Sequence, residues 1–579
     1  MIHKESRRSR AAGLCTLRFF RIYFNKKLNG RSLFLFLFFI AMLIPRLEAQ
    51  SFQDEKDPWD LARALIERMS DEDALAQTFM LGWFDTGQGP SDLIQEWITK
   101  RNVGGVKVFG WNTSDIEKLS LTIGNFQREA LRRNPHIPLF VATDQEGGFV
   151  RHVKDLTSDT PGAMAIGASG FPEDAYRSGL YIGRELAALG INMNFAPTVD
   201  LYTNHNSALI GSRAFGDDPV KAGILGAAFV RGQLAAGIIP TAKHFPGHGD
   251  TALDSHGVLP RINADFQTLW ERELVPYRML VKEGIPAVMS GHIAFPNTQA
   301  KMMPASLSPY FLTEILREKI GFQGLIITDD LSMNGATTSA GSLWIAAKAA
   351  LSAGNDVIMI SRTPELNAPI WVNLLDAMHK EPDFRARVRD AATKVLFIKL
   401  KHLKGERALP HIPDVSKVKQ NVPDKEGAPF FQDLAARSVT IVQEKPGLFP
   451  IPREKARNIL LAGQNLDFFN IGRLAYPSVP RYWYTAPVSA EFLSMARSAD
   501  IIIFYLEKSE GIDVLRAIKP LGKKVIVLSV LSPAYLEAVP WVDGAIAVYS
   551  NSYESLIAGF SAILGKIKAE GRLPFTLRQ

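Results

Sequence analysis

A fourteen-residue stretch from Lys243 to His256 holds the residues best suited to catalysis. It contains three histidines, two aspartates and a lysine, and its glycines and proline disfavour a regular helix. We therefore expect a loop. The close spacing of Asp254 and His256 can set a carboxylate against an imidazole, which orients the ring and favours its charged form. Because free imidazole titrates near pH ~6.5, such a pair can exchange protons near neutrality.

A zinc site is the alternative use of these histidines. His244 and His248 have a spacing known from zinc ligands, but that spacing works when both rings lie on one face of a helix. Pro246, Gly247 and Gly249 prevent such a helix. We expect no metal here and no cofactor.

Short apolar runs that alternate with helical stretches must position this loop. Seven runs are predicted strands: Gly105–Phe109, Leu139–Thr143, Met193–Ala196, Ile238–Ala242, Ala287–Ser290, Leu325–Thr328 and Asp356–Ile360. Repeated strand–helix units over about 340 residues indicate a (β/α) barrel or a doubly wound sheet. Seven strands favour the barrel.

Polar residues come directly after five of these strands. They are Asp144–Gly148, Pro197–Asp200, the loop from Lys243, Gly291-His292 and Asp329–Met333. In a barrel such residues converge on one mouth, where the active site is built, whereas on a doubly wound sheet they converge less well. Taken alone, Asp330 is better explained as a helix N-cap. His292 could equally be a core histidine bonded to backbone.

Residues 1–49 are predicted to be a secretory signal peptide. Basic residues precede the twelve-residue apolar run Leu33–Ile44, and Ala49 supplies a small residue for cleavage. The run is short for a membrane span, which needs about 20 residues. A retained N-terminal anchor is the alternative. We expect an exported protein, periplasmic or extracellular, that meets a membrane only through an uncleaved signal.

The formal charge of +7 belongs to the same segment. Residues 1–49 hold ten Lys or Arg and two Glu, so this segment carries +8 and the rest of the chain is near −1. Because the excess of basic residues lies in the predicted signal peptide, we expect no nucleic-acid partner. The one cysteine, Cys15, lies there as well, so the mature chain has neither disulfide nor thiol chemistry.

The mature chain is long enough for two or more domains. We expect a barrel over residues 50–404, a proline-containing and charged linker over 405–428, and a second domain over 429–579. In the last, four more apolar runs predict a three-layer α/β/α sandwich: Ile459–Ala462, Asp500–Phe504, Val525–Ser529 and Ala545–Tyr549. No glycine-rich phosphate fingerprint opens it, so we expect no nucleotide.

The chain resembles glycoside hydrolase family 3, specifically its β-N-acetylglucosaminidase branch. The segments that carry the resemblance are the loop ending Asp254-Ser255-His256, Ile210–Phe215, Pro304–Ser308, Gly321–Gly324, Thr328–Met333, Ala435–Thr440 and Gly571–Pro574. The resemblance implies a TIM-like barrel followed by a sandwich domain. It also implies that Asp329 attacks the anomeric carbon, with His256 as general acid/base and Asp254 as its partner. Glycoside cleavage needs an anionic nucleophile and a proton donor of this kind.

The resemblance further implies that Asp144, Arg213, Lys243 and His244 bind the sugar. The sequence departs from the family at Phe149, because relatives usually carry arginine directly after the Glu-Gly-Gly run. If that arginine contacts the substrate beyond the cleaved sugar in relatives, leaving-group preference differs here. Phe149 could offer an apolar platform for a sugar face.

The expected function is a retaining β-N-acetylglucosaminidase that acts on cell-wall fragments or other N-acetylglucosaminides. Two enzyme alternatives are a β-glucosidase and a phosphorylase, since a histidine acid/base leaves less negative charge beside an incoming phosphate than a glutamate would. A non-catalytic secreted sugar-binding protein is the alternative from another class. The set Asp254, His256 and Asp329 argues against it, because binding alone needs no nucleophile.

Overall fold

The computed structural model describes residues 51–86, 89–154, 156–255 and 257–578. The predicted signal peptide (1–49) and His256 therefore lie outside the described residues. The chain divides into Met1–Ser51 and Phe52–Gln579, and all described helices and strands belong to the second unit.

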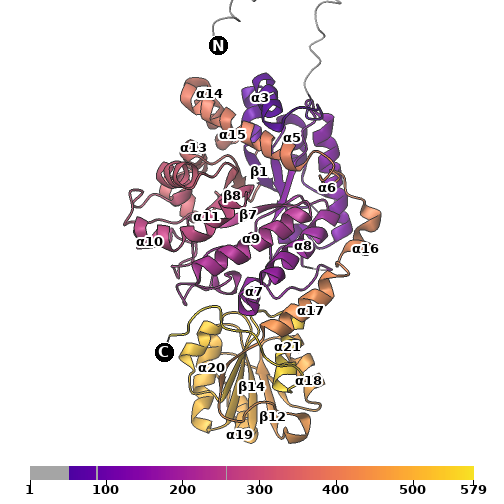
Figure 1. Cartoon of the computed structure of the whole chain (residues 1–579), viewed down its shortest axis with the longest axis vertical. Helices are drawn as coiled ribbons and strands as arrows, with labels where there is room; N and C mark the ends of the chain where they lie inside the picture. Colours follow the sequence, from indigo (N-terminus) through magenta and orange to yellow (C-terminus); the bar gives the residue numbers. More distant parts are fainter. Residues whose placement is uncertain (1–50, 87–88, 155, 256, 579) are drawn as a thin grey trace, which may run out of the picture. The chain divides into compact units, whose positions relative to one another are not determined.

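Eight parallel strands form the first sheet (Figure 1). In chain order they are β1 (Phe79–Gly82), β2 (Gly105–Lys107), β3 (Phe140–Thr143), β6 (Met193–Asn194), β7 (Ile239–Phe245), β8 (Ala287–Ser290), β9 (Leu325–Thr328) and β10 (Ile358–Ile360). Strand β10 pairs with β1, and a bridge between Ile327 and Val357 joins β9 to β10. The sheet is thus a nearly closed barrel, which confirms the predicted fold class.

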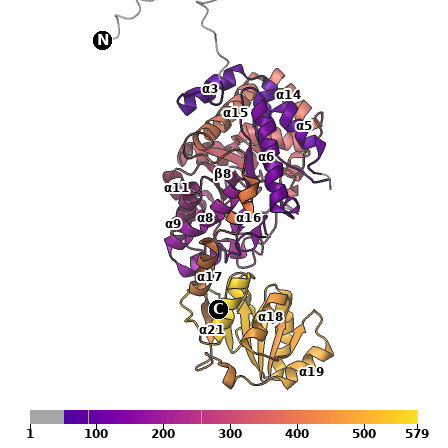
Figure 2. The ribbon, with the colours of Figure 1, turned by 90° about the vertical axis from the view of Figure 1, so that its right-hand side faces the viewer.

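Side chains alternate along the barrel strands between an inner and an outer core. Met80, Ala142, Met289 and Ile327 belong to the inner cluster, whereas their neighbours in sequence pack against the surrounding helices. This alternation is what a filled barrel requires. The helices around the strands (Figure 2) include α4 (Asp71–Gln77), α5 (Asp92–Arg101), α6 (Ile116–Arg132), α8 (Pro172–Ala188), α9 (Pro219–Ala235), α11 (Leu274–Lys282), η4 (Tyr310–Lys319), α13 (Leu343–Ala353), α14 (Pro369–Lys380) and α15 (Pro382–His402).

Two features of the barrel differ from the sequence analysis. Strand β1 was not predicted, because only Thr78 separates it from α4 and the two apolar segments run together. Strand β7 extends to Phe245, so Lys243 and His244 lie on the strand and not in the following loop. A register shift against β8 after Ala242 accommodates these polar residues at the strand's end.

The second sheet has six strands in the order β11-β16-β15-β14-β12-β13. Their bounds are β11 (Thr440–Glu444), β12 (Ile459–Gly463), β13 (Arg481–Trp483), β14 (Ile501–Leu506), β15 (Lys524–Ser529) and β16 (Gly544–Ala547), and only β11 pairs antiparallel. One face packs on α17 (Gly427–Ser438), α18 (Leu466–Ala475) and α21 (Tyr553–Ile563). The other packs on α19 (Ala490–Ser498), α20 (Glu510–Ile518) and η8 (Pro533–Ala538). The predicted three-layer sandwich is confirmed.

The segment predicted as a linker, 405–428, carries structure of its own. It contains η5 (Val415–Lys417) and α16 (Val418–Asn421), and α17 begins at Gly427. Val418 and Val422 are buried, and the N–H of Asp424 donates to Glu185 Oε1 at 2.8 Å. The segment therefore packs along the barrel. No helix in the described part of the chain is long and apolar enough to cross a membrane.

Candidate active site

The polar residues that follow the barrel strands meet at the carboxyl edge of the sheet. Asp144 follows β3, Asp200 follows β6, His292 follows β8 and Asp329 follows β9, while Lys243 and His244 end β7. Because all eight strands are parallel, these positions share one end of the barrel. Three connected clusters of contacts result.

Asp144 is the centre of the first cluster. Its Oδ2 lies 2.6 Å from Lys107 Nζ, and its Oδ1 lies 2.5 Å from Lys243 Nζ. The ring of His152 is near the same carboxylate, with Nδ1 3.8 Å from Oδ2. Burial alone would raise the pKa of Asp144, but the two lysines hold it well below its usual range. Asp144 is therefore an ionised acceptor at the floor of the site.

The second cluster joins Arg213 to Glu146. Arg213 Nε and a terminal nitrogen donate to the two oxygens of Glu146 at 2.9 and 2.8 Å, and Lys243 Nζ lies 2.6 Å from Oε1. Burial alone would raise the pKa of Glu146. The positive charge of Arg213 and, less strongly, that of Lys243 lower it to about 2. A further bond to the carbonyl of Leu209 fixes the guanidinium. Three of its five N–H donors are thus used within the protein.

The third cluster is built on Asp200. Its Oδ2 lies 2.7 Å from Nδ1 of His244, and its Oδ1 accepts the backbone N–H of His248 at 2.7 Å. Burial opposes ionisation of Asp200, but His244 lowers its pKa below the ordinary value. The carboxylate therefore fixes His244 with its proton on Nδ1 and leaves Nε2 as the ring atom for a ligand.

Asp329 and Asp330 occupy different environments. Asp329 is anchored by its backbone N–H on Ser290 O at 3.0 Å, and its Oδ1 accepts the N–H of Asp330 at 2.8 Å. Burial would raise the pKa of Asp329, but nearby charges lower it below the ordinary value, and His244 has the largest lowering effect. The Oδ1 of Asp330 accepts the N–H groups of Ser332 and Ser361. Asp330 therefore holds a turn, whereas Asp329 is ionised and available.

His292 is held at both ring nitrogens. Its Nδ1 lies 2.7 Å from Ser306 Oγ and its Nε2 lies 3.0 Å from the carbonyl of Asp330. Burial lowers the pKa of His292, so the ring is neutral. Nε2 then donates to the carbonyl and Nδ1 accepts the hydroxyl proton. His292 is therefore a core histidine bonded to backbone, one of the two roles that the sequence analysis left open. Its hydrogen bond to the carbonyl of Asp330 holds the chain next to Asp329.

The loop with the predicted acid/base pair is only partly described. Asp254 is exposed, and its carbonyl accepts the N–H groups of Gly257 and Val258. His256 lies outside the described residues. The carbonyl of Ser255 accepts the N–H of Gly335, in α12 (Asn334–Ala340), at 3.2 Å. The residue before His256 is thus tied to the segment that follows Asp329.

Several site residues were not selected from the sequence: Lys107, Glu146, His152, Asp200 and His248. The sequence could have identified Lys107 as a site residue, because a lysine inside an otherwise apolar strand needs a buried counter-charge. It could also have identified Asp200 and Glu146, since both follow barrel strands. His248 lies in the stretch from Lys243 to His256, where the sequence analysis weighed it only as a zinc ligand. In the structure, burial lowers its pKa to about 4, and its Nδ1 has no partner within the described ranges. In those ranges no group of three His, Cys, Asp or Glu has the arrangement of a metal site.

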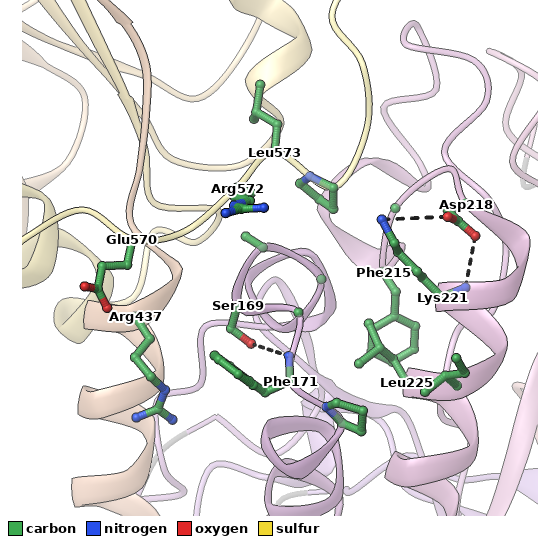
Figure 3. Close-up of a pocket in the computed structure, with 17 residues that line it drawn as sticks. Ser169, Phe171, Phe215, Asp218, Lys221, Leu225, Arg437, Glu570, Arg572 and Leu573 are labelled. Carbon is green, nitrogen blue, oxygen red and sulfur yellow. Dashed lines mark hydrogen bonds and ion pairs between the residues drawn. The ribbon is translucent and has the colours of Figure 1, made fainter.

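The structure also contains a cavity of about 570 Å³ (Figure 3). Phe171, Phe215, Lys221, Arg437 and Arg572 line it, and those predicted sugar-binding and catalytic residues that the structure describes do not. The walls come from the end of α7 (Ala163–Ser169), the start of α8, α9, the end of α17 and the C-terminal tail. Its position assigns it no part in the chemistry at the barrel mouth.

Comparison with known proteins supports a single family. Residues 73–398, more than half of the chain, match the model described as glycosyl hydrolase family 3 N terminal domain. A Beta-hexosaminidase of Tolumonas auensis is 36% identical over 295 residues, which cover 50% of this chain and 84% of that protein. Beta-hexosaminidase A of Pseudoalteromonas piscicida is 37% identical over 258 residues, or 42% of this chain. The match spans only 43% of that relative.

A solved structure is similar over both domains. The glycoside hydrolase family 3 β-N-acetylglucosaminidase from Paenibacillus sp. str. FPU-7 superimposes with a TM-score of 0.78 at 28% identity. The superposition covers 88% of this chain and 99% of that one. The order of barrel and sandwich is therefore shared.

Proposed function

We propose that this chain, which belongs to glycosyl hydrolase family 3, is a retaining β-N-acetylhexosaminidase. It removes terminal non-reducing β-N-acetylglucosamine from N-acetylglucosaminides. The family assignment agrees with the resemblance seen in the sequence. The relatives' names supply the sugar class.

The observation that carries the proposal is the state of Asp329. Its carboxylate is ionised, accepts one hydrogen bond from the N–H of Asp330, and stands at the strand edge shared with His244 and Lys243. An ionised carboxylate of this kind is the nucleophile of retaining glycosidases. In the first step an Asp329 oxygen bonds to the anomeric carbon while the bond to the leaving oxygen breaks.

We assign the proton transfers to His256, with Asp254 as its partner. The imidazolium gives its proton to the leaving oxygen as the glycosidic bond breaks. The neutral ring then takes a proton from water, whose oxygen bonds to the anomeric carbon and releases Asp329. Ser255, tied to Gly335, keeps this loop beside the segment after the nucleophile.

We assign recognition of the sugar to Asp144, Arg213, Lys243 and His244. Asp144 offers an ionised acceptor, and His244 offers Nε2 because Nδ1 is bonded to Asp200. Arg213 keeps two N–H donors after its bonds to Glu146 and Leu209. Donors fixed in this way reject a substrate that cannot pair with them, which gives selectivity for the acetamido group.

A panel of 4-nitrophenyl glycosides tests the proposal. We expect β-N-acetylglucosaminide to be cleaved far faster than β-glucoside, and proton NMR to show first-formed sugar of β configuration. Faster cleavage of the glucoside would assign a β-glucosidase. A sugar phosphate formed when phosphate is added would assign a phosphorylase, and a first product of inverted configuration would remove Asp329 from its role.

We further propose that the protein is exported through the signal peptide 1–49 and acts on cell-wall fragments. The motivation is the basic flank and apolar run before Ala49. Expression of the full chain, followed by fractionation and N-terminal sequencing, tests this. A mature N-terminus close to residue 50 outside the cytoplasm is expected, and an intact N-terminus on cytoplasmic protein would contradict it.

A further inference from the structure

The cavity of Figure 3 has walls from both domains, and we call it the interdomain cavity. Helices α7, α8 and α9 belong to the barrel, whereas the end of α17 and the C-terminal tail lead into and out of the sandwich. Its volume of about 570 Å³ is that of a small-molecule site, since such sites measure about 300–1,000 Å³. The lining includes three cationic and two acidic side chains: Lys221, Arg437, Arg572, Asp218 and Glu570.

Phe171 presents an aromatic ring to the interdomain cavity from a fixed position. The residue is 59% exposed, and within the described ranges no other aromatic ring stacks on it. Its N–H donates to Ser169 Oγ at 3.4 Å, and its carbonyl accepts the N–H of Asp174 at 3.0 Å. Pro172, the first residue of α8, further restricts the backbone before it. A ring on a fixed backbone can bind a ligand at a low entropic cost.

Two guanidinium groups line the same cavity. A terminal nitrogen of Arg437 donates to Asp174 Oδ1 at 2.6 Å, which holds the end of α17 against the start of α8. The backbone N–H of Arg572 donates to the carbonyl of Ala168 at 3.0 Å. The guanidinium of Arg572 has no hydrogen-bond or ion-pair partner among the residues that the structure describes. Arg572 therefore offers all its N–H donors to a ligand, and Arg437 offers those that Asp174 leaves.

The mixed lining favours a neutral ligand that is rich in hydroxyl groups. An anion would be attracted by the arginines, but Asp218 and Glu570 would repel it. A purely apolar ligand would displace water from the guanidinium groups without replacing its hydrogen bonds. A pyranose suits both parts of the lining, because its hydroxyls donate and accept hydrogen bonds and its C–H face fits the negative face of an aromatic ring.

We propose that the interdomain cavity binds a segment of a carbohydrate chain built of N-acetylglucosamine units, as a second site apart from the catalytic centre. Phe171 packs on a sugar face, and Arg437 and Arg572 donate to hydroxyl or acetamido oxygens. The predicted catalytic residues that the structure describes do not line the cavity, so the segment is held there without being cut. The identity of the sugar rests on the proposed function. A polymer held in this way raises the effective concentration of chain ends at the barrel.

Affinity electrophoresis of the protein in gels that contain glycol chitin tests the second site. Phe171→Ala should raise the dissociation constant for the polymer about three- to tenfold, because the sugar loses its aromatic contact. Arg572→Met should act in the same direction and leave urea unfolding unchanged, because this guanidinium has no protein partner. Neither variant should change kcat/KM for 4-nitrophenyl β-N-acetylglucosaminide by more than about twofold, because this small substrate needs only the catalytic centre.

Trp483→Ala is the matched control. Trp483 is 50% exposed but lies on β13 and does not line the cavity, so retardation by glycol chitin should not change. Unchanged retardation in Phe171→Ala or Arg572→Met would overturn the second site, and so would an equal loss in Trp483→Ala. Retardation by polyglutamate that Arg572→Met abolishes would make it an anion site and overturn the proposal. If the wild-type protein does not cleave the 4-nitrophenyl glycoside, the proposed function fails, while the glycol chitin gels still decide the role of the cavity.

Discussion

Asp329 and Asp330 are neighbours in sequence, yet their carboxylates meet different partners. Asp329 accepts one N–H, from Asp330, while Asp330 accepts the N–H groups of Ser332 and Ser361. The first is free to react and the second is engaged by the backbone. Their variants should therefore fail in different ways.

We expect Asp329→Ala to lose turnover by several orders of magnitude while it folds normally, because the nucleophile is removed and few protein contacts depend on it. Asp330→Ala should keep most turnover and lose about 1–3 kcal/mol of unfolding free energy, because two N–H groups lose their acceptor. Steady-state kinetics and urea unfolding measure both effects. An inactive Asp330→Ala beside an active Asp329→Ala would reverse the assignment.

The proposed pair Asp254 and His256 makes a prediction about leaving groups. His256→Ala should lower the rate of cleavage most for leaving groups that need a proton and least for 4-nitrophenolate. The double change should cost little more than the worse single change, because the two residues act as one unit. Rates for an aryl glycoside series decide this. Equal damage across the series would mean that His256 has a structural role.

At the scale of elements, Arg213 and Glu146 tie η2 (Gly211–Arg213) to β4 (Gln145–Gly147). Both side chains are almost fully buried, so loss of one leaves a buried charge with fewer partners. Arg213→Met should cost about 3 kcal/mol of unfolding free energy.

Adding Glu146→Gln should recover part of that loss, because the uncompensated carboxylate is then neutral. Urea unfolding of the two single variants and the double variant gives the coupling. Strictly additive costs would show that the pair does not stabilise these two elements together.

The sequence identified seven barrel strands and the four central sandwich strands, because buried parallel strands read as apolar runs. It missed the sheet-edge strands β11 and β13, whose side chains are partly exposed and lack such a run. Within the site it selected Arg213 and Lys243 by resemblance. It did not find Glu146 as their partner, since contacts between residues so far apart in sequence depend on loop geometry that no local pattern encodes.

At the scale of the whole molecule, the sandwich domain supports the loop that carries Asp200. Tyr202, two residues further on, bonds through its hydroxyl to Ser532 Oγ at 2.7 Å, and His205 Nδ1 lies 2.6 Å from Glu537 Oε1. The ring of Phe575 packs edge-on against both Tyr202 and His205. These contacts brace the floor of the site from outside the barrel.

Stability should fall as the pH falls from about 6.5 towards 4. Burial lowers the pKa of His248 and of His402 to about 4, whereas both titrate near ~6.5 when unfolded. Between these two pKa values the unfolded chain binds protons on both histidines while the folded protein leaves them neutral. The stabilisation is therefore complete above the unfolded pKa and is lost as the pH falls towards the folded pKa.

Each such group changes the unfolding free energy by at most about 1.4 kcal/mol per pH unit. Urea unfolding at pH 7.5, 5.5 and 4.5 measures the slope, and His402→Gln, at the end of α15, should flatten it without touching the site. A slope that is unchanged in this variant would show that His402 is not among its causes.

The central claim is that Asp329 becomes covalently bonded to the sugar. A 5-fluoro-N-acetylglucosaminyl fluoride forms the glycosyl-enzyme with an activated leaving group and slows its hydrolysis, because fluorine disfavours the positive charge that develops on the ring. Mass spectrometry of the trapped protein and of its proteolytic peptides should show one sugar on Asp329, and none on Asp329→Ala. A sugar bonded to another residue, or turnover without any adduct under conditions that slow the second step, would contradict the account.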